Sequence, residues 1–544
     1  MKSMLSQLSS APLNRSLLSL ATLLACHGAS AADLKMSTEL SRYGSAEVDA
    51  RQVRLDDPAT VPQGASSAAG RPEVRPAAFE MGLSRMKMPT GEGVGLLSGS
   101  YLVAMSEDWG IGPSAYGAAT GQYGGLFTAG FTAQGRWRVG DQGVASVSLY
   151  AGAGGGVGSG KVRYGGGLML RPELSWRTSV GRGSYLGVSL AHVRFPSGNV
   201  RSTGWGLIWG MDDRFISYPS SAAGQWSLSS DRSGFGFDRM WVHGGLNRPD
   251  PGSLGRDGLP LAHRMGTAGF LLEQEWVPGQ WWGLEASGAA AGGADGYAEV
   301  LGVAGLEWPL GHLPVKLGVS GGVGLGGGGN LDTGGGMVWR AGPTARVALG
   351  NGWHLGMDAG WRRAPQGRWQ SRYLRAHLGF DLDSPSTGLE DRPAARQIAM
   401  YRVMFLTQGL QKITFKQGAA EPVKQLGIGV ERDWGAHGVL IGQAGSAAWG
   451  KAGAYSYGLF GLGLRWPVSP SWRVGVQSLV GAGGGGGVKV AGGAITQNEV
   501  YAMWQGQRWL VKGGFGQWRN LRGEIQSTPT WHVGLGYAFG AAGH

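Results

Sequence analysis

The chain has 544 residues, 104 of them glycine, and only 15% of its residues are charged. The glycines follow no Gly-X-Y period, which excludes collagen, and a hydrophobic content of 42% is too high for an intrinsically disordered chain. The formal charge of +12 is spread without a long run of Lys or Arg, so we expect no nucleic-acid partner.

The first 31 residues have the composition of a secretory signal peptide. Lys2 and Arg15 supply positive charge, residues 16–26 form an apolar core, and the Ala-Ser-Ala sequence at 29–31 fits a cleavage site. This core of about 11 residues is shorter than the roughly 20 that a membrane-spanning helix needs. We therefore expect residues 1–31 to be removed on export.

Two further features belong to the N-terminal part of the chain. The one cysteine, Cys26, lies inside the predicted signal peptide, which excludes a disulfide in the mature chain. Residues 23–26 also resemble a lipobox, so a lipidated Cys26 is an alternative fate. Residues 32–75 are polar and lack periodicity, which favours a flexible periplasmic arm or a partial plug.

From residue 76 onward the chain repeats itself three times. An acidic residue followed by tryptophan anchors each unit, a second tryptophan follows 28, 32 and 32 residues later, and an aromatic residue closes the unit after 106, 104 and 105 residues. These landmarks are Asp108-Trp109, Trp137 and Phe215; Glu275-Trp276, Trp308 and Phe380; and Asp433-Trp434, Trp466 and Phe539. We expect repeats at 76–215, 237–382 and 398–539 and a tail at 540–544. Each repeat of about 140 residues can hold roughly eight transmembrane strands.

The last segment of the third repeat alternates strictly between two faces. Apolar residues occupy one face and small or polar residues the other, as in a strand with lipid on one side. The apolar face consists of Trp531, Val533, Leu535, Tyr537 and Phe539. This strand resembles the C-terminal assembly signal of Gram-negative outer-membrane β-barrel proteins, although residues 540–544 follow its final aromatic residue. The resemblance implies an antiparallel transmembrane barrel, an outer-membrane location, and outer-membrane lipid, lipopolysaccharide and the barrel assembly machinery as partners.

Aromatic and charged residues recur at fixed places in the units. Aromatic residues at strand ends are typical of lipid-interface girdles, and we assign this role to Trp137, Trp308, Trp466, Trp531, Tyr537 and Phe539. Charges in a barrel wall are tolerated toward the lumen, preferably in pairs. We therefore expect a charge ladder along the lumen, built from Asp108, Glu275, Asp433, Arg194, Arg363 and Arg519.

Catalytic chemistry has little support in the sequence. His192 and Ser197 resemble loosely the His/Ser site of small lipid A deacylase barrels, yet the other two repeats place no histidine nearby. The histidines show no metal-ligand spacing, so we expect no metal and no cofactor. We predict no catalytic residues and no enzyme, and keep a lipid A-type hydrolase as the weakest alternative.

The leading functional hypothesis is a conduit for an envelope polysaccharide or an anionic solute. A structural or adhesive outer-membrane scaffold is the main alternative. The three units predict either one barrel of about 24 strands or three barrels of eight. Similar closing strands and abundant glycine favour small, filled barrels, whereas tandem barrels in one chain are uncommon, and a single wall is slightly preferred.

Overall fold

The computed structural model describes residues 71–140, 143–156, 161–229, 232–383 and 394–543, all within the compact unit Gln63–His544. The predicted signal peptide 1–31, including Cys26, and most of the predicted arm lie outside the described residues. Within the ranges described, no helix is both long and apolar enough to cross a membrane.

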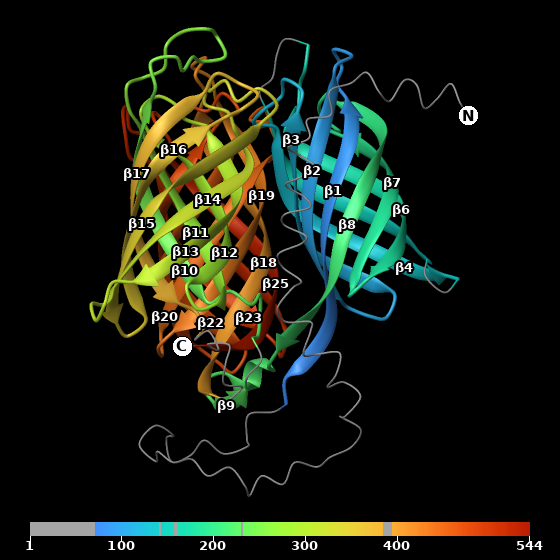
Figure 1. The fold of residues 1–544 in the computed structure, drawn as a ribbon, viewed down its shortest axis with the longest axis vertical. Coiled ribbons are helices and arrows are strands. Elements are labelled where there is room, and N and C mark those ends of the chain that lie inside the picture. Colours follow the sequence, from blue (N-terminus) through green and yellow to red (C-terminus); the bar gives the residue numbers. More distant parts are fainter. Residues whose placement is uncertain (1–70, 141–142, 157–160, 230–231, 384–393, 544) are drawn as a thin grey trace, which may run out of the picture. The chain divides into compact units, whose positions relative to one another are not determined.

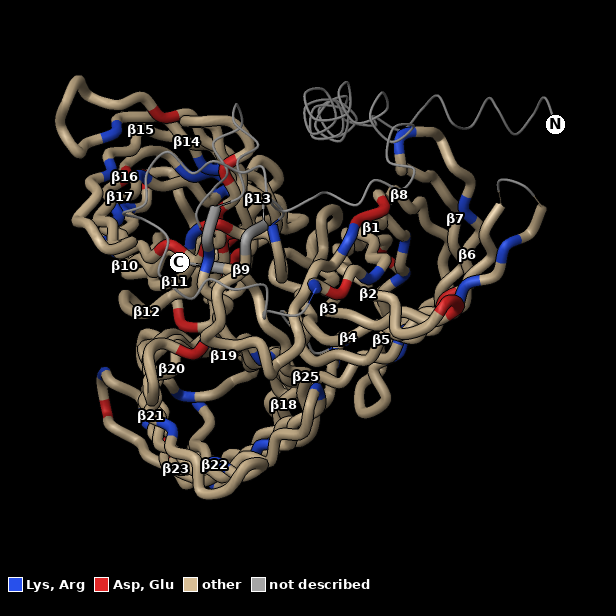
Figure 2. Tube along the Cα trace, turned by 90° about the horizontal axis from the view of Figure 1, so that it is seen from below, with Lys and Arg blue, Asp and Glu red and all other residues tan. Residues whose placement is uncertain are grey.

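Three separate antiparallel barrels of eight strands follow one another along the chain (Figures 1 and 2). The prediction of an all-β fold with three tandem eight-stranded units is therefore confirmed. Each wall closes by pairing its own first and last strands, at registers such as Glu73↔Ser217, Arg239↔Asp381 and Tyr401↔Phe539. The single large wall, slightly preferred from the sequence, is wrong.

The strands of the three barrels have the following bounds. Barrel 1 consists of β1 (Glu73–Lys87), β2 (Gly93–Ala104), β3 (Trp109–Thr120), β4 (Phe127–Val139), β5 (Gly143–Gly155), β6 (Leu168–Gly181), β7 (Ser184–Arg194) and β8 (Arg201–Ser217). Barrel 2 consists of β10 (Arg239–Pro249), β11 (Met265–Val277), β12 (Gln280–Ala291), β13 (Ala298–Pro309), β14 (Val315–Gly327), β15 (Met337–Gly350), β16 (Trp353–Arg363) and β17 (Gln370–Asp381). Barrel 3 consists of β18 (Ala394–Thr414), β19 (Ala420–Trp434), β20 (Gly438–Trp449), β21 (Ser456–Pro467), β22 (Trp472–Gly484), β23 (Ala494–Gln505), β24 (Trp509–Asn520) and β25 (Ser527–Gly543). Residues 540–543 of the predicted tail thus belong to β25.

The connections alternate between short turns at one end of each barrel and longer loops at the other. Two residues separate β6 from β7, whereas residues 250–264 separate β10 from β11. In transmembrane barrels the short turns face the periplasm and the longer loops face the exterior. We therefore call the two ends the periplasmic end and the outer end.

At the outer end the three barrels contact one another in a closed cycle. Loop 121–126 of barrel 1 meets loop 328–336 of barrel 2, where the N–H of Gly124 donates to the carbonyl of Gly334 (2.7 Å). Loop 292–297 of barrel 2 approaches loop 485–493 of barrel 3 at Gly296 and Gly485. Loop 450–455 of barrel 3 returns to barrel 1, where Gly453 N–H donates to Gly165 (3.0 Å).

Each of these contacts joins the connection after the third strand of one barrel to the connection after the fifth strand of the next. A head-to-tail contact of this kind closes into a ring when the rotation fits, as it does here after three steps. The contacts are made by glycine because the backbones approach closely: a Cβ on Gly125 would lie 2.6 Å from the nitrogen of Gly328. Gly155, Gly327 and Gly484, each at the end of a fifth strand, likewise face the backbone of another barrel. We call this set of loops the glycine ring.

Basic side chains reinforce the ring. Arg256, in the first loop of barrel 2, donates to the carbonyl of Gln122 in barrel 1 (2.9 Å). Lys416, in the first loop of barrel 3, pairs with Asp295 of barrel 2 (3.0 Å). The first loop of barrel 2 thus contacts barrel 1, and the first loop of barrel 3 contacts barrel 2.

At the periplasmic end the linker between barrels 1 and 2 packs against barrel 3. It contains the short helix η1 (Ser220–Ala222) and strand β9 (Trp226–Ser229), which pairs with the first residues of β18. Phe215 and Phe539 meet edge to face with their ring centroids 5.1 Å apart. Both ends of the structure thus join barrels that are distant in sequence.

Candidate functional site

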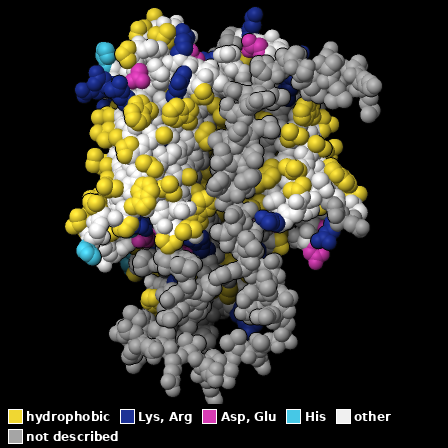
Figure 3. Space-filling model, in the orientation of Figure 1, with side chains coloured by type: hydrophobic (Ala, Val, Ile, Leu, Met, Phe, Trp, Pro, Cys, Tyr) yellow, Lys and Arg dark blue, Asp and Glu magenta, His cyan; other side chains and the backbone are white. Residues whose placement is uncertain are grey.

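The outer faces of the barrels present apolar side chains to the surroundings (Figure 3). Leu207, Leu374 and Leu535, on the last strands of the three barrels, are exposed. Exposed tryptophans flank this apolar band toward the periplasmic end, among them Trp137, Trp308 and Trp466 of the predicted girdle. An apolar outer band with aromatic edges is the exterior of a transmembrane barrel.

The other three predicted girdle residues are less exposed than these tryptophans. Trp531 and Tyr537 are partly buried, and Phe539 is buried against Phe215 and Phe235 where the linker meets barrel 3. Phe539 therefore packs against other protein residues and does not present its ring to lipid in the described structure.

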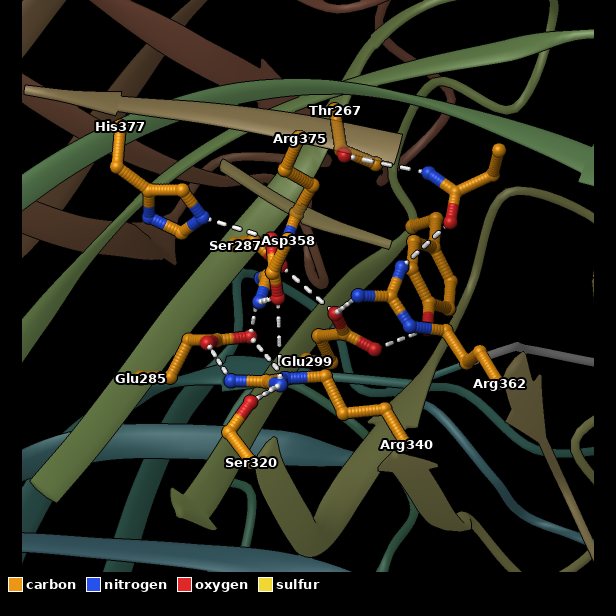
Figure 4. Close-up of polar contacts among 12 residues, drawn as sticks. Thr267, Glu285, Ser287, Glu299, Ser320, Arg340, Asp358, Arg362, Arg375 and His377 are labelled. Carbon is orange, nitrogen blue, oxygen red and sulfur yellow. Dashed lines mark hydrogen bonds and ion pairs between the residues drawn. The ribbon is translucent and has the colours of Figure 1, made fainter. Parts of the chain in front are cut away.

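The interior of barrel 2 holds a network of buried ion pairs (Figure 4). Glu285 of β12 accepts from Arg340 of β15 (2.5 and 3.1 Å) and from Arg375 of β17 (2.6 Å). Arg375 also forms a bidentate pair with Asp358 of β16 (2.6 and 2.9 Å), which accepts a further contact from His377 (2.7 Å). Side chains from four strands, β12, β15, β16 and β17, thus form one buried network.

Two further clusters fill barrel 2 on either side of this network. Toward the outer end, Arg362 pairs with Glu299 (2.8 Å). Toward the periplasmic end, the Arg346 guanidinium lies between the rings of Trp241 and Trp281, 4.6 and 4.4 Å from their centroids. It pairs there with Glu273 and Glu307, at 2.9 and 2.6 Å.

Barrel 1 is filled by fewer charges and more hydroxyl groups. Arg177 pairs with Glu80, which also accepts from Tyr185 (2.8 Å), and Arg171 pairs with Glu173 (2.7 Å). A void lined in part by Glu80 and Arg171 has a volume of about 20 Å³, and a void in barrel 2 about 10 Å³. Each has room for roughly one water molecule.

Barrel 3 uses a different set of residues. Lys512 of β24 donates to Glu431 and Gln477, both at 2.6 Å, and Arg465 also pairs with Glu431. His532 lies 3.1 Å from Glu499. Paired polar groups therefore occupy each interior, although the residues differ between barrels.

Pairing is what makes these buried charges tolerable. Removing an ion from water costs several kcal/mol, which a partner at hydrogen-bond distance must offset. Strand alternation places the charges inside: Trp281, Gly283, Glu285 and Ser287 all lie on the buried face of β12. The sequence therefore did contain a signal for these interior charges: in β12 the single charge, Glu285, stands at a position that alternates in step with the other inward-facing residues.

The predicted charge ladder does not gather in one place. Asp108 is exposed in a turn, and Glu275 accepts from Gly279 (2.6 Å) in the turn between β11 and β12. Asp433 pairs with Arg402 (2.5 Å) and Arg465 (3.1 Å) at the periplasmic end of barrel 3. The three recurring arginines are all exposed on the outer faces of their barrels, namely Arg194, Arg363 and Arg519.

The structure gives the histidine and serine of the hydrolase hypothesis separate partners. His192 Nδ1 lies 2.8 Å from the hydroxyl of Thr203, and Ser197 accepts from the N–H of Gly166 (2.8 Å). Among the described residues, no group of histidine, cysteine, aspartate and glutamate side chains could hold a metal ion.

No protein-family model matches the sequence, and no curated protein matches it either. Solved structures do match. The siderophore receptor PirA from Pseudomonas aeruginosa is 11% identical over 86% of this chain and 81% of that chain, with a TM-score of 0.28. OccK2 (OpdF) from Pseudomonas aeruginosa, in complex with glucuronate, is 10% identical over 86% and 98%, with a TM-score of 0.22.

The siderophore receptor PiuA from Acinetobacter baumannii is 6% identical over 85% of this chain and 81% of that chain, with a TM-score of 0.26. These similarities are too low to carry an argument about function. The three closed walls, the apolar outer band and the exposed tryptophans carry the assignment instead. The chain has the fold of a transmembrane β-barrel protein, built from three tandem barrels.

Proposed function

We propose that the protein is a structural, non-conducting scaffold of the outer membrane, without chemistry of its own. The observation that carries this proposal is the filling of the three interiors by paired buried side chains. Eight-stranded barrels have an interior just wide enough for side chains to fill. The ring then supplies the scaffold's stiffness, because each barrel contacts both of the others.

The void volumes support the same proposal. Spaces of about 20 and 10 Å³ hold a water molecule each, whereas a sugar ring or a hydrated anion needs far more room. A solute could pass barrel 2 only if Glu285 separated from Arg340 and Arg375. Such a step would expose buried charges and is costly.

The conduit for a polysaccharide or an anionic solute stays a second candidate because arginines line the interiors and would suit an anion. It requires the interior ion pairs to open. A hydrolase finds less support, since His192 and Ser197 are each bonded to another group.

Conductance in planar bilayers separates these candidates. We expect the refolded full-length protein, checked for a heat-modifiable band on gels, to give no current steps at applied potentials of either sign. Steady or voltage-gated steps would overturn the scaffold and favour the conduit. A porin refolded and inserted in the same way is the positive control for the detection of current steps.

A further inference from the structure

The arginines that recur once per repeat occupy equivalent places on the outer faces. Arg194, Arg363 and Arg519 lie at or next to the outer ends of β7, β16 and β24, the seventh strand of each barrel. All three are exposed. Below them, the same strands present large exposed apolar residues, such as Trp361 (57% exposed) and Phe515 (69%). The arginines thus lie at the upper edge of the lipid-facing band.

Barrel 1 groups four such cations. Arg194 is the register partner of Arg201 on β8. The N–H of Lys87, on β1, donates to the hydroxyl of Ser202 (2.9 Å), so Lys87 lies across the closing seam from the residue next to Arg201. Arg85 lies two residues further down the same outward face of β1. We call these residues the basic patch: Arg85, Lys87, Arg194 and Arg201.

The direction of these side chains follows from strand alternation. Met86, between Arg85 and Lys87, is buried, and so is Val193 before Arg194. Successive residues of a strand point to opposite faces. The four cations therefore project away from the barrel interior, on the same side as the apolar band.

The basic patch lacks anionic partners within the described part of the chain. None of its four residues forms an ion pair there, whereas Arg372 and Arg368 of barrel 2 pair with Asp250 (3.7 Å) and Asp332 (2.7 Å). Like charges directly opposite each other in a sheet destabilise it. An anion bound between Arg194 and Arg201 would remove this repulsion.

The surroundings indicate which kind of anion fits. Trp205, two residues below Thr203 on β8, is 63% exposed. Exposed Leu190 lies beside it on β7, and exposed Leu207 lies below it on β8. A ligand with phosphate groups at the patch could therefore lay hydrocarbon chains along the same strands. Arginine forms bidentate hydrogen bonds with phosphate, and the outer end faces the outer leaflet.

We propose that the basic patch of barrel 1 binds the phosphate groups of lipopolysaccharide in the outer leaflet. The proposal rests on the outer-membrane location and is independent of whether the barrels conduct. A silent bilayer and a conducting one are equally compatible with it, so the two proposals fail separately.

The test compares lipid binding by full-length variants in detergent micelles. The probes are bisphosphorylated lipid A, the same lipid after phosphatase treatment, and phosphatidylglycerol, each titrated against tryptophan fluorescence. The variant R194Q/R201Q removes two charges from the patch. R138Q/R182Q removes two exposed charges at the periplasmic end of the same barrel and is the matched control.

We expect R194Q/R201Q to bind bisphosphorylated lipid A about tenfold more weakly than the wild type, since two solvent-exposed charge pairs with phosphate are lost. R138Q/R182Q should bind as the wild type does, and the dephosphorylated lipid should bind weakly to all three proteins. Equal losses in both variants would overturn the proposal. So would wild-type binding that is indifferent to the phosphates, or phosphatidylglycerol binding as tight as lipid A binding.

Discussion

The barrel interiors and the glycine ring are both closely packed, but by opposite means. Inside barrel 2, long side chains such as Arg340 and Glu285 cross the lumen and pair with charges from the facing strands. At the closest contacts of the glycine ring, backbone meets backbone, as where Gly453 donates to Gly165. The first kind of contact fills the interior of one barrel, and the second brings two barrels together.

The two regions also differ in how they repeat. At its closest backbone contacts the ring uses glycine or alanine in all three barrels, because a larger side chain there would separate the backbones. The interiors repeat only in part. Arg171 and Arg340 are both the fourth residue of the sixth strand, whereas barrel 3 has Gln497 there and places Lys512 on the next strand. Filling a lumen requires balanced charge and volume, which many residue sets can supply.

Removing one charge from the interior of barrel 2 should have the largest effect. Glu285→Gln leaves Arg340 and Arg375 short of a shared, fully buried carboxylate. Breaking a buried pair in this way costs about 3–5 kcal/mol. We expect the urea midpoint of the detergent-solubilised protein, followed by tryptophan fluorescence, to fall accordingly.

The control for this variant is Glu92→Gln, which removes an exposed carboxylate in the first loop of barrel 1 and should leave the midpoint unchanged. In E285Q/R340Q the loss should be smaller than the sum of the single losses, because the charge left behind is also removed. Additive losses would contradict the network.

The sequence predicted the strands better than their partners. Alternation and the repeat indicated three units of about eight strands, because each strand carries its own pattern. That pattern does not indicate which strand closes a barrel, because the closing pair joins residues far apart in the sequence. In barrel 1, for example, β1 pairs with β8 at Glu73↔Ser217. One wall and three walls therefore fitted the sequence about equally well.

The candidate site was less predictable for a different reason. The predicted charge ladder consists of charges that recur in all three repeats. Arg194 and its equivalents recur because they share a position at the outer ends of the seventh strands. Their phase was readable, since Arg194 alternates with buried Val193. The interior charges were missed because their residue types change between repeats.

Asp238 is a buried carboxyl group that lies outside the barrels, where the linker meets barrel 2, and its titration can be tested. It pairs with Arg232 (3.0 Å) and accepts the N–H of Glu275 (2.6 Å). Burial raises the pKa of Asp238 to about 6, although Arg232 opposes the shift. An unfolded aspartate has a pKa of about 3.9.

Between these two values the folded protein holds a proton that the unfolded chain has released. Stability due to Asp238 is therefore present at low pH and is lost as the pH rises toward about 6. The full difference is about 3 kcal/mol. We expect the stability of wild type minus that of Asp238→Asn, measured by urea midpoints from pH 4 to 8, to decline through this window. Parallel profiles would contradict the shift.

A substitution in the glycine ring should have the smallest effect on stability, and it tests the close approach of two barrels. An added Cβ at Gly484 of barrel 3 would overlap the nitrogen of Gly296 in barrel 2. Gly484 lies outside the left-handed backbone region, so strain in Gly484→Val arises from its neighbour alone. We expect a cost of about 1–3 kcal/mol, borne by the contact between the two barrels.

A cross-link can measure that contact directly. A Cβ at position 288 would lie 3.4 Å from the Cβ of Ala482, close to the spacing of a disulfide. G288C/A482C should therefore oxidise readily, and adding Gly484→Val should lower the yield of the cross-link. Gly458→Val is the matched control, because nothing lies within 4 Å of its added Cβ. If both valines lowered the yield equally, the glycines of barrel 3 would be serving their own wall rather than the ring.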